Sequence, residues 1–273
     1  MNTPVPSGDC AELIQTIKRK KRLVTILTSI AVVIVITVCS PVYMEVMGEV
    51  VVDYQGIHPV AAGCIVLFIL LCGLLAYGKA MLPLSSALDE ECDPQKHLML
   101  NEALNRQKNL DIIRAVDYFY IGEFESAAAY ADKMIADKNV HRKAAGLFNK
   151  ARCAFFSGNF EVLKQLVSQY EGHVAAMKGS RAKTGELYEK FGRSLKLLVA
   201  LADDDVEGIT AYRDLAVWND SKATRGYIDY LKGLAAYRLG ETQEAVYRFM
   251  AVKESCAKTV LAALAEEYLS NLM

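Results

Sequence analysis

Charge is almost absent from one part of this 273-residue chain. Of its 63 charged residues, only 3 lie within residues 23–77, whereas 7 lie in residues 1–22 and 53 in residues 78–273. The mean hydropathy of +0.17 is therefore the average of a membrane segment and a soluble domain. This distribution excludes a chain that is disordered over most of its length, a transporter with many spans and a disulfide-stapled secreted mini-protein.

An excess of positive charge is also lacking, since 31 Lys and Arg residues stand against 32 Asp and Glu residues. A nucleic-acid-binding domain normally has a basic face and a high pI. We therefore expect no nucleic acid among the partners. The seven cysteines are scattered without any CxxC pair, which is typical of reduced, individually buried thiols.

Catalytic motifs are missing as well. The chain has no phosphate-binding GxxxxGK[ST] loop, no GxGxxG, no HExxH and no GxSxG, and its four histidines are isolated from one another. Two acidic groups remain as alternative metal sites, residues 89–93 with His97 and residues 203–205. We interpret the first as a solvated linker and the second as acids beside a helix N-terminus. The sequence thus predicts no enzymatic activity, no cofactor and no metal.

Two uncharged runs predict membrane-spanning helices. Residues 23–44 would extend about 33 Å as a helix and residues 60–77 roughly 27 Å, close to the thickness of a hydrocarbon core. The first run is rich in β-branched residues, but a lone strand cannot satisfy its backbone hydrogen bonds in lipid, so we expect a helix. No ionisable residue lies inside either run, which disfavours a proton relay or an ion site.

The basic residues indicate the orientation of this pair. Residues 18–22, which are Lys18, Arg19, Lys20, Lys21 and Arg22, precede the first run, whereas residues 45–59 contain three acids and no Lys or Arg. By the positive-inside rule, residues 1–22 and the soluble domain lie in the cytoplasm and the acidic loop 45–59 lies outside. We therefore predict a multi-pass protein of the cell membrane. The compactness of the chain and the lack of a eukaryotic targeting motif favour a bacterial source.

Three alternatives compete for this segment. A signal peptide cleaved near Cys39 is disfavoured by the length of the apolar run and by Pro41. A lipoprotein modified at Cys39 is disfavoured by the bulky Val38. The basic cluster, finally, is either a topology signal or a patch for anionic lipid, and we favour the topology signal.

The rest of the chain reads as helical. Residues 78–99 contain Pro83 and Pro94 and predict a juxtamembrane linker. Residues 100–273 contain no proline, and their apolar residues recur at helical spacing between turns, so we predict an all-α domain.

A short phrase recurs at these turns. An apolar or aromatic stretch, a turn residue and then an inward-facing residue recur around positions 122, 158, 204 and 240, spaced by 36, 46 and 36 residues. A period in this range is typical of stacked helical hairpins. A glycine at the turn ends the first helix in a left-handed conformation, and small residues such as Ala127 and Ala245 let the two helices approach.

These positions resemble the tetratricopeptide repeat family, abbreviated TPR. The fourth unit matches best, and the residues at family positions are Gly233, Ala236, Tyr237, Gly240, Ala245, Phe249 and Val252. The usual Trp of the first helix and the inter-repeat Pro are absent, and ten extra residues separate units two and three. The resemblance covers roughly residues 104–252 and implies about four helical hairpins in a solenoid. Residues 256–273 then predict a capping helix. An ordinary helical bundle that repeats a turn phrase is the alternative.

The resemblance also implies a binding groove lined by the first helix of each unit. The residues that it places there are Ile112, Val116, Tyr120, Phe148, Arg152, Phe156, Tyr230, Leu234 and Arg238. This set is mainly apolar, which suits an amphipathic helix or an extended peptide, with the two arginines available for an acidic group.

The sequence therefore predicts a membrane-anchored cytosolic scaffold that binds an unidentified protein or peptide. The alternative is an accessory subunit of a transport, secretion or envelope-stress complex that acts through its two spans.

Overall fold

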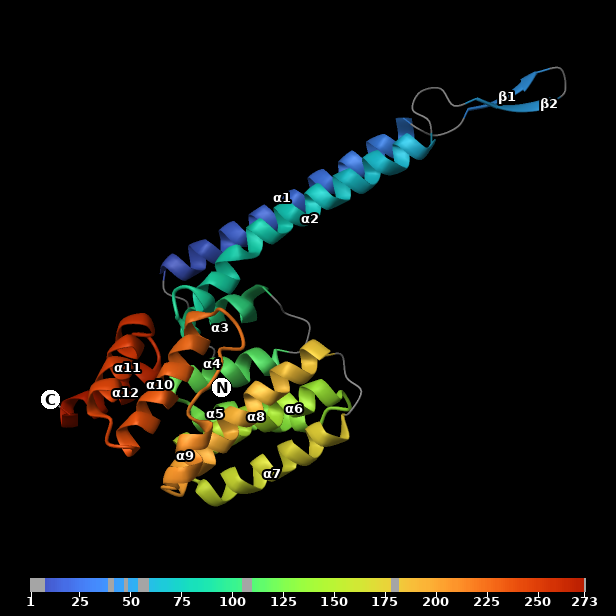
Figure 1. Cartoon of the computed structure of the whole chain (residues 1–273). Helices are drawn as coiled ribbons and strands as arrows, with labels where there is room; N and C mark the ends of the chain where they lie inside the picture. Colours follow the sequence, from blue (N-terminus) through green and yellow to red (C-terminus); the bar gives the residue numbers. More distant parts are fainter. Residues whose placement is uncertain are drawn as a thin grey trace. The chain divides into compact units, whose positions relative to one another are not determined.

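The computed structural model of the protein describes residues 8–38, 42–46, 49–53, 59–104, 110–177 and 182–272. The chain divides into two compact units, Met1–Pro83 and Leu84–Met273. Helices dominate both units, so the prediction of an all-α protein is confirmed; the strands of the described residues are two short ones in the first unit (Figure 1).

The first unit holds a long helix pair and a hairpin. Helix α1 (Gly8–Val38) is followed by the antiparallel strands β1 (Val42–Val46) and β2 (Glu49–Asp53), and then by α2 (Pro59–Asp89), which continues into the second unit. The first predicted span differs at its end, because the helix expected over residues 23–44 ends at Val38 and β1 begins at Val42. Pro41 lies between them in the sequence. Inside a helix a proline removes a backbone hydrogen bond, and it disfavours the helical conformation for the residue before it.

Helices α1 and α2 contact each other closely at one glycine. A Cβ atom placed on Gly73 would lie 2.6 Å from Oγ1 of Thr28, so only glycine fits there without displacement. Nearby, the ammonium group of Lys21 lies 5.3 Å from the ring centroid of Tyr77. Pairing of residue 28 with 73 and of residue 21 with 77 means that the two helices run antiparallel.

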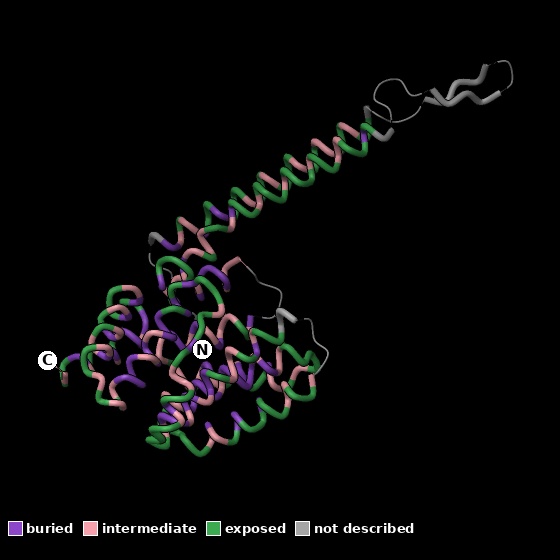
Figure 2. Tube along the Cα trace, in the orientation of Figure 1, coloured by how far each residue is buried: buried purple, intermediate pink, exposed green. Residues whose placement is uncertain are grey.

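One helix in the described parts of the chain is long and apolar enough to cross a membrane. It covers residues Ala61–Asp89, which is 29 residues, and none of its most apolar stretch is buried within the protein. Along α1 and α2 most side chains are exposed or half-buried (Figure 2). The helix is longer than the predicted span 60–77 and takes up much of the predicted linker.

The second unit consists of helices that follow one another at short turns. After α3 (Pro94–Leu104), consecutive helices pack in pairs. These pairs are α4 (Asp111–Ile121) with α5 (Phe124–Ile135), α6 (Val140–Phe156) with α7 (Phe160–Ala176), α8 (Ala182–Ala202) with α9 (Val206–Tyr212), and α10 (Lys222–Arg238) with α11 (Thr242–Ser255). Helix α12 (Val260–Leu272) packs on α11 and α10.

Each pair turns through the same backbone conformation. The φ angle is positive at Gly122 (96°), Gly158 (72°), Asp204 (51°) and Gly240 (74°). The N–H of the next residue then donates to the carbonyl five residues before it, at 2.8 to 2.9 Å in all four turns. This is the Schellman arrangement, in which a left-handed residue satisfies carbonyls at the helix end. The four turn positions expected from the sequence are therefore four equivalent turns.

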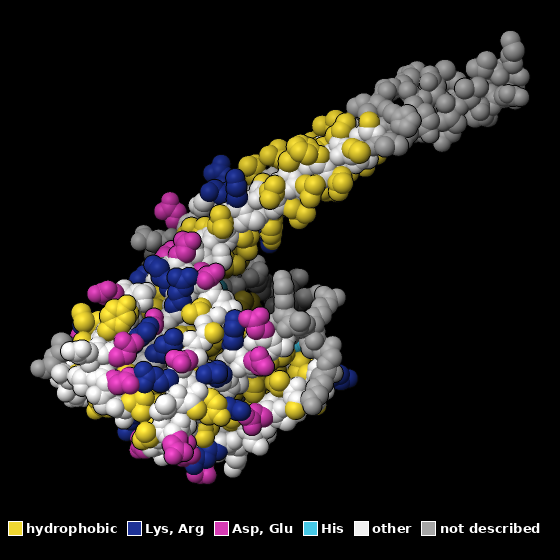
Figure 3. Space-filling view, viewed as in Figure 1, with side chains coloured by type: hydrophobic (Ala, Val, Ile, Leu, Met, Phe, Trp, Pro, Cys, Tyr) yellow, Lys and Arg dark blue, Asp and Glu magenta, His cyan; other side chains and the backbone are white. Residues whose placement is uncertain are grey.

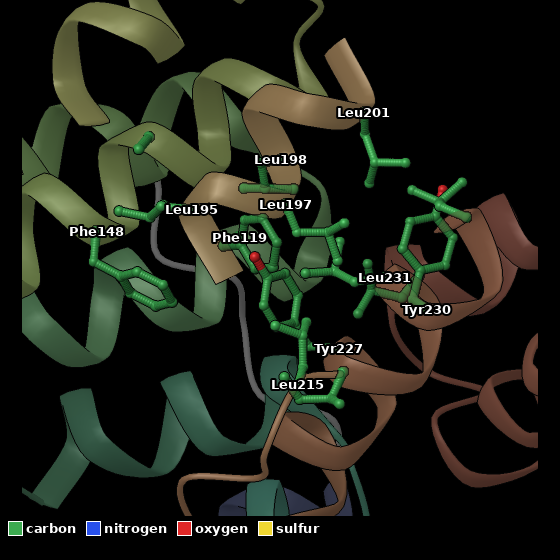
Figure 4. Close-up of a cluster of buried hydrophobic side chains, with 14 of the residues drawn as sticks. Phe119, Phe148, Leu195, Leu197, Leu198, Leu201, Leu215, Tyr227, Tyr230 and Leu231 are labelled. Atoms are coloured by element: carbon green, nitrogen blue, oxygen red, sulfur yellow. The ribbon is translucent and has the colours of Figure 1, made fainter. Parts of the chain in front are cut away.

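The core of the second unit is formed where the first helices of the pairs meet. Helices α4, α6, α8 and α10 contact one another in this order, and Figure 4 shows Phe119, Phe148, Leu198 and Tyr227 from these four helices pointing into one cluster. Helix α4 also reaches α10, because the rings of Phe119 and Tyr227 lie 5.9 Å apart. The inner face of the four pairs is thus largely filled by its own side chains.

Candidate functional site

A cleft of about 470 Å³ opens on the second unit. It lies between the end of α6 and the start of α7 on one side and α10 and α12 on the other, with one residue of α8 at its base. The lining residues are Phe155, Phe156, Gly158, Phe160, Leu201, Tyr230, Leu234, Arg238, Leu264, Glu267, Tyr268 and Asn271. We call this the aromatic cleft.

Local sequence explains why these side chains meet. Gly158 turns the chain between α6 and α7 and leaves Phe156 on one side of the turn and Phe160 on the other. On α10, residues 230, 234 and 238 are each four apart and therefore share one face of the helix. The ring centroids of Phe156 and Tyr230 lie 5.6 Å apart, which joins the two sides at the bottom.

The cleft is apolar at its base and carries an exposed ring and charged groups at its rim. Tyr230 and Leu234 are buried, whereas Phe160 is 40% exposed and Arg238 and Glu267 reach solvent. Arg238 forms an ion pair of 2.8 Å with Asp204, the left-handed residue of the third turn. Burial raises the pKa of the Tyr230 hydroxyl, so this group stays neutral at pH 7 and can donate a hydrogen bond. Such a site offers rings for apolar anchors and a few polar groups for orientation.

Four of the nine residues expected in a groove line this cleft: Phe156, Tyr230, Leu234 and Arg238. The residues of α12 that line the cleft are not among the nine expected from the repeat pattern. Leu264 and Tyr268 are four residues apart within the predicted capping helix 256–273, and this spacing is the signal that they share one helical face. In the structure this face both covers the last pair and forms a wall of the cleft.

The other five residues lie elsewhere. Ile112 is 40% exposed and Val116 is half-buried, and neither lines the cleft. Tyr120, Phe148 and Arg152 are each only 3% exposed. Their position differs from a groove lining because side chains of α4 reach α10. The hydroxyl of Tyr120 donates to a backbone carbonyl of α10 at 3.0 Å, and the ring of Phe119 contacts that of Tyr227. This contact encloses the surface that a more open array would leave to solvent.

Arg152 occupies a cage of aromatic rings. Its guanidinium carbon lies 4.2 Å from the ring centroid of Phe119, 4.6 Å from that of Phe148 and 5.0 Å from that of Tyr227. The guanidinium donates to the side-chain oxygen of Asn149, while its Nε has no hydrogen-bond partner. No carboxylate of the described residues pairs with it. Arg152 is therefore a buried cation held chiefly by rings.

His97 and Asp117 form a second buried polar contact. Nδ1 of His97 lies 2.8 and 2.9 Å from the two carboxylate oxygens of Asp117, whose side chain is fully buried. Burial raises the pKa of Asp117 to about 6, and the hydrogen bond from His97 opposes this rise. The folded protein thus binds a proton at Asp117 more tightly than the unfolded chain. The stability gained from the neutral form is present at low pH and lost as the pH rises through about 6.

A second hollow, of about 790 Å³, lies between α7 and α8 and has a different character. Seven of its lining residues are charged. Several neutralise one another, as Lys190 does with Glu186 at 2.8 Å and Lys196 with Glu171 at 3.2 Å. None of the nine expected groove residues lines it.

No metal site is visible in the part of the chain that the structure describes, where no three His, Cys, Asp or Glu side chains gather. Comparison with protein-family models, with curated proteins and with solved structures found no match for this chain.

Proposed function

We propose that this protein is a membrane-anchored scaffold whose TPR-like helical domain binds a protein segment in the aromatic cleft. The observation that carries the proposal is the cleft itself, where Phe156, Tyr230, Leu234 and Arg238 meet the face of α12. Rings exposed at the rim of a concave apolar site are typical of recognition of an amphipathic helix or an extended peptide.

The repeated turns support the TPR-like description. Four helix pairs close with the same left-handed turn, and the first helices of successive pairs contact one another in chain order. A repeat protein stacks in this way because one pair cannot bury its apolar face alone. The solenoid that we propose is short and closed, because its first pair reaches its fourth.

Membrane anchoring by two spans is the second part of the proposal. Helix α2 has the length and composition of a span. We assign α1 as its antiparallel partner because its residues from Leu23 onward are uncharged, large apolar side chains along it are exposed, and Gly73 seats Thr28 between the two helices. The basic residues before Leu23 then hold both chain ends in the cytoplasm.

In this arrangement the scaffold has no catalytic role of its own. Anchoring to the membrane raises the local concentration of the bound partner, so a cleft of modest affinity is sufficient to hold it at the membrane. The partner segment that fits best has an aromatic or aliphatic anchor for the ring-lined base and polar groups for Arg238 and Glu267.

Site-specific photo-crosslinking in the full-length chain tests the proposal. A photoreactive phenylalanine analogue replaces Phe160 at the cleft or, as the control, Tyr247, an aromatic residue that is 64% exposed and does not line the cleft. We expect a discrete crosslinked protein from position 160 and none from position 247. Equal crosslinking from both positions, or none from 160, would contradict the assignment of the cleft.

A charge variant gives the matched control in the same assay. Arg238→Ala removes the arginine of the cleft, and Arg225→Ala removes another exposed arginine that also pairs with an aspartate, at 3.0 Å. We expect Arg238→Ala to weaken crosslinking at position 160 and Arg225→Ala to leave it unchanged. If both variants act alike, the effect belongs to net charge and not to the cleft.

A further inference from the structure

A cluster of five basic residues on α1 forms no ion pair with any described carboxylate. Of these, Lys18, Arg19, Lys20 and Arg22 are exposed, and Lys21 is half-buried beside the ring of Tyr77. Elsewhere, many Lys and Arg residues of the second unit pair with acids across or along helices. Five adjacent cations without an acid repel one another, and an external anion would relieve this repulsion.

The helix divides the cluster into two groups. Lys18, Arg19 and Arg22 surround a surface hollow of about 330 Å³ together with Leu23 and Ile26. Residues 18, 22 and 26 are one helical turn apart, and so are residues 19 and 23, so all five lie on one side of α1. Lys20 and Lys21 fall outside this arc, and Lys21 is turned toward α2.

The hollow is therefore basic at one end and apolar at the other. Leu23 is 57% exposed and Ile26 is 44% exposed, and both begin the uncharged stretch of the helix. Figure 3 shows Lys and Arg side chains gathered where the apolar surface of the α1 and α2 pair begins. Tyr77 lies at the same level of the pair, and tyrosine is enriched at the boundary between lipid and water.

We propose that this hollow binds one anionic phospholipid, with the phosphate at Lys18, Arg19 and Arg22 and the first carbons of an acyl chain along Leu23 and Ile26. The proposal rests on the membrane insertion of α1 that is part of the proposed function. Arginine pairs with phosphate through two parallel hydrogen bonds, and the lysine adds a point charge. The apolar end distinguishes a lipid from an acidic peptide or a free phosphate ion, since neither of these needs Leu23 and Ile26.

The expected size of the effect follows from the charges. A basic residue close to an anionic membrane surface is worth about fivefold in affinity. Removal of three such residues should therefore lower the affinity for an anionic lipid on the order of 100-fold. The affinity for a zwitterionic lipid should change little.

Binding of acyl-labelled phospholipids to the full-length protein in detergent tests the proposal. Fluorescence anisotropy compares labelled phosphatidylglycerol with labelled phosphatidylcholine. The test variant is Lys18→Gln, Arg19→Gln, Arg22→Gln, which keeps Lys20 and Lys21. The matched control is Lys138→Gln, Lys222→Gln, Lys232→Gln, which removes the same charge from side chains of the second unit that form no ion pair with a described carboxylate.

We expect phosphatidylglycerol to bind more tightly than phosphatidylcholine, the test variant to lose this preference and the control to keep it. The charge-preserving variant Lys18→Arg, Arg19→Lys, Arg22→Lys should retain a preference, because it keeps the three positive charges. Equal loss in the test and control variants would overturn the proposal, as would equal binding of both lipids. Competition by inorganic phosphate as strong as that by unlabelled phosphatidylglycerol would show an anion site without a lipid.

Extraction of membranes with alkaline carbonate separates this proposal from the proposed function. If the protein is extracted, the anchoring of α1 and α2 is refuted together with the lipid site. If it stays in the membrane and shows no lipid preference, only the lipid site is refuted.

Discussion

Replacement of the caged arginine by methionine should leave the stability of the protein nearly unchanged. In Arg152→Met the side chain keeps an unbranched apolar stem, and its end points toward the rings of Phe119, Phe148 and Tyr227 that surround the guanidinium of Arg152. The change removes a cation that is 3% exposed and an Nε without a hydrogen-bond partner. We expect the removal of this buried charge to make the largest contribution to the change in the free energy of unfolding.

Two opposing contributions decide the magnitude. Burial of a guanidinium costs several kcal/mol even after relaxation. A desolvated cation–π contact with a ring within about 6 Å stabilises the cation by about 2 kcal/mol. Three rings lie 4.2 to 5.0 Å from the guanidinium carbon of Arg152. The contributions nearly cancel. Arg152→Met also removes the hydrogen bond to Asn149, a loss that favourable contacts of the methionine sulfur with the same rings offset. We therefore expect Arg152→Met to change the free energy of unfolding by no more than about 1 kcal/mol.

The partner of the arginine supplies the contrasting variant. Asn149→Ala leaves the guanidinium buried without the side-chain oxygen that accepts its hydrogen bond. A lost hydrogen bond to a charged group costs about 1.5 to 3 kcal/mol, so this variant should be destabilised by roughly that amount. In the Arg152→Met background the same change should cost about 1 kcal/mol less, because no charge is left without its acceptor.

Urea unfolding followed by tryptophan fluorescence provides the assay. Trp218 is the single tryptophan of the chain, and its ring lies 5.7 Å from Phe148 and 5.8 Å from Tyr227, two rings that contact Arg152. Destabilisation of Arg152→Met by more than 2 kcal/mol would refute the reasoning, as would equal cost of Asn149→Ala in both backgrounds. Arg152→Glu should unfold this region, since it places a carboxylate among the rings, and it is therefore unsuitable as a test of the cleft.

Three further predictions use the same urea assay or its thermal equivalent. His97→Ala should lower stability by about 2 to 4 kcal/mol at pH 8 and by less at pH 5, because its buried aspartate partner is then neutral; a loss independent of pH would contradict this. Gly158→Ala should lower stability by about 1 to 2 kcal/mol, because the φ of 72° strains a residue with a Cβ atom; that Cβ would meet no described atom within 4 Å, so no clash adds to the cost. Asp204→Gly at the equivalent turn position should be neutral or stabilise by about 0.5 kcal/mol. Gly73→Leu should lower the thermal stability of the detergent-solubilised helix pair, and Gly63→Leu, where nothing lies within 4 Å, should not; equal effects would show that the close contact is unimportant.

Local features of the fold were predictable from the sequence because they depend on neighbouring residues. A turn glycine, the apolar residues around it and the absence of proline are enough to place helix ends, and four predicted turns share one backbone conformation. Asp204 belongs to this set although it is not glycine. The repeat spacing revealed it, since Asp is one of the few other residues that adopt a left-handed conformation at modest cost.

Boundaries near the membrane were less predictable. Charge-free runs mark what lipid tolerates, but they do not mark where a helix begins or ends. Helix α2 continues through Pro83 to Asp89 and occupies a segment that looked like a linker, while α3 starts at Pro94, a residue well suited to the first turn of a helix. The prediction of a linker over residues 78–99 relied on the two prolines as signals of irregular structure, and both prolines lie in helices.

The cleft shows where a repeat pattern reaches its limit as a predictor. Helices α6 and α10 are each the first helix of a pair, and each turns one face inward. The pattern of apolar residues on that face is the same whether the face meets a partner or another helix. Long-range closure decides between the two: Phe119 reaches Tyr227, and this contact buries Arg152, while residues further along α10 stay open toward α12. A charged residue on an inward face is read from sequence as a binding group because burial of an unpaired cation is costly. Here the aromatic residues on the same inward faces offset the cost of burying Arg152, so this arginine belongs to the core. The cleft opens where these aromatic side chains no longer fill the space between the helices.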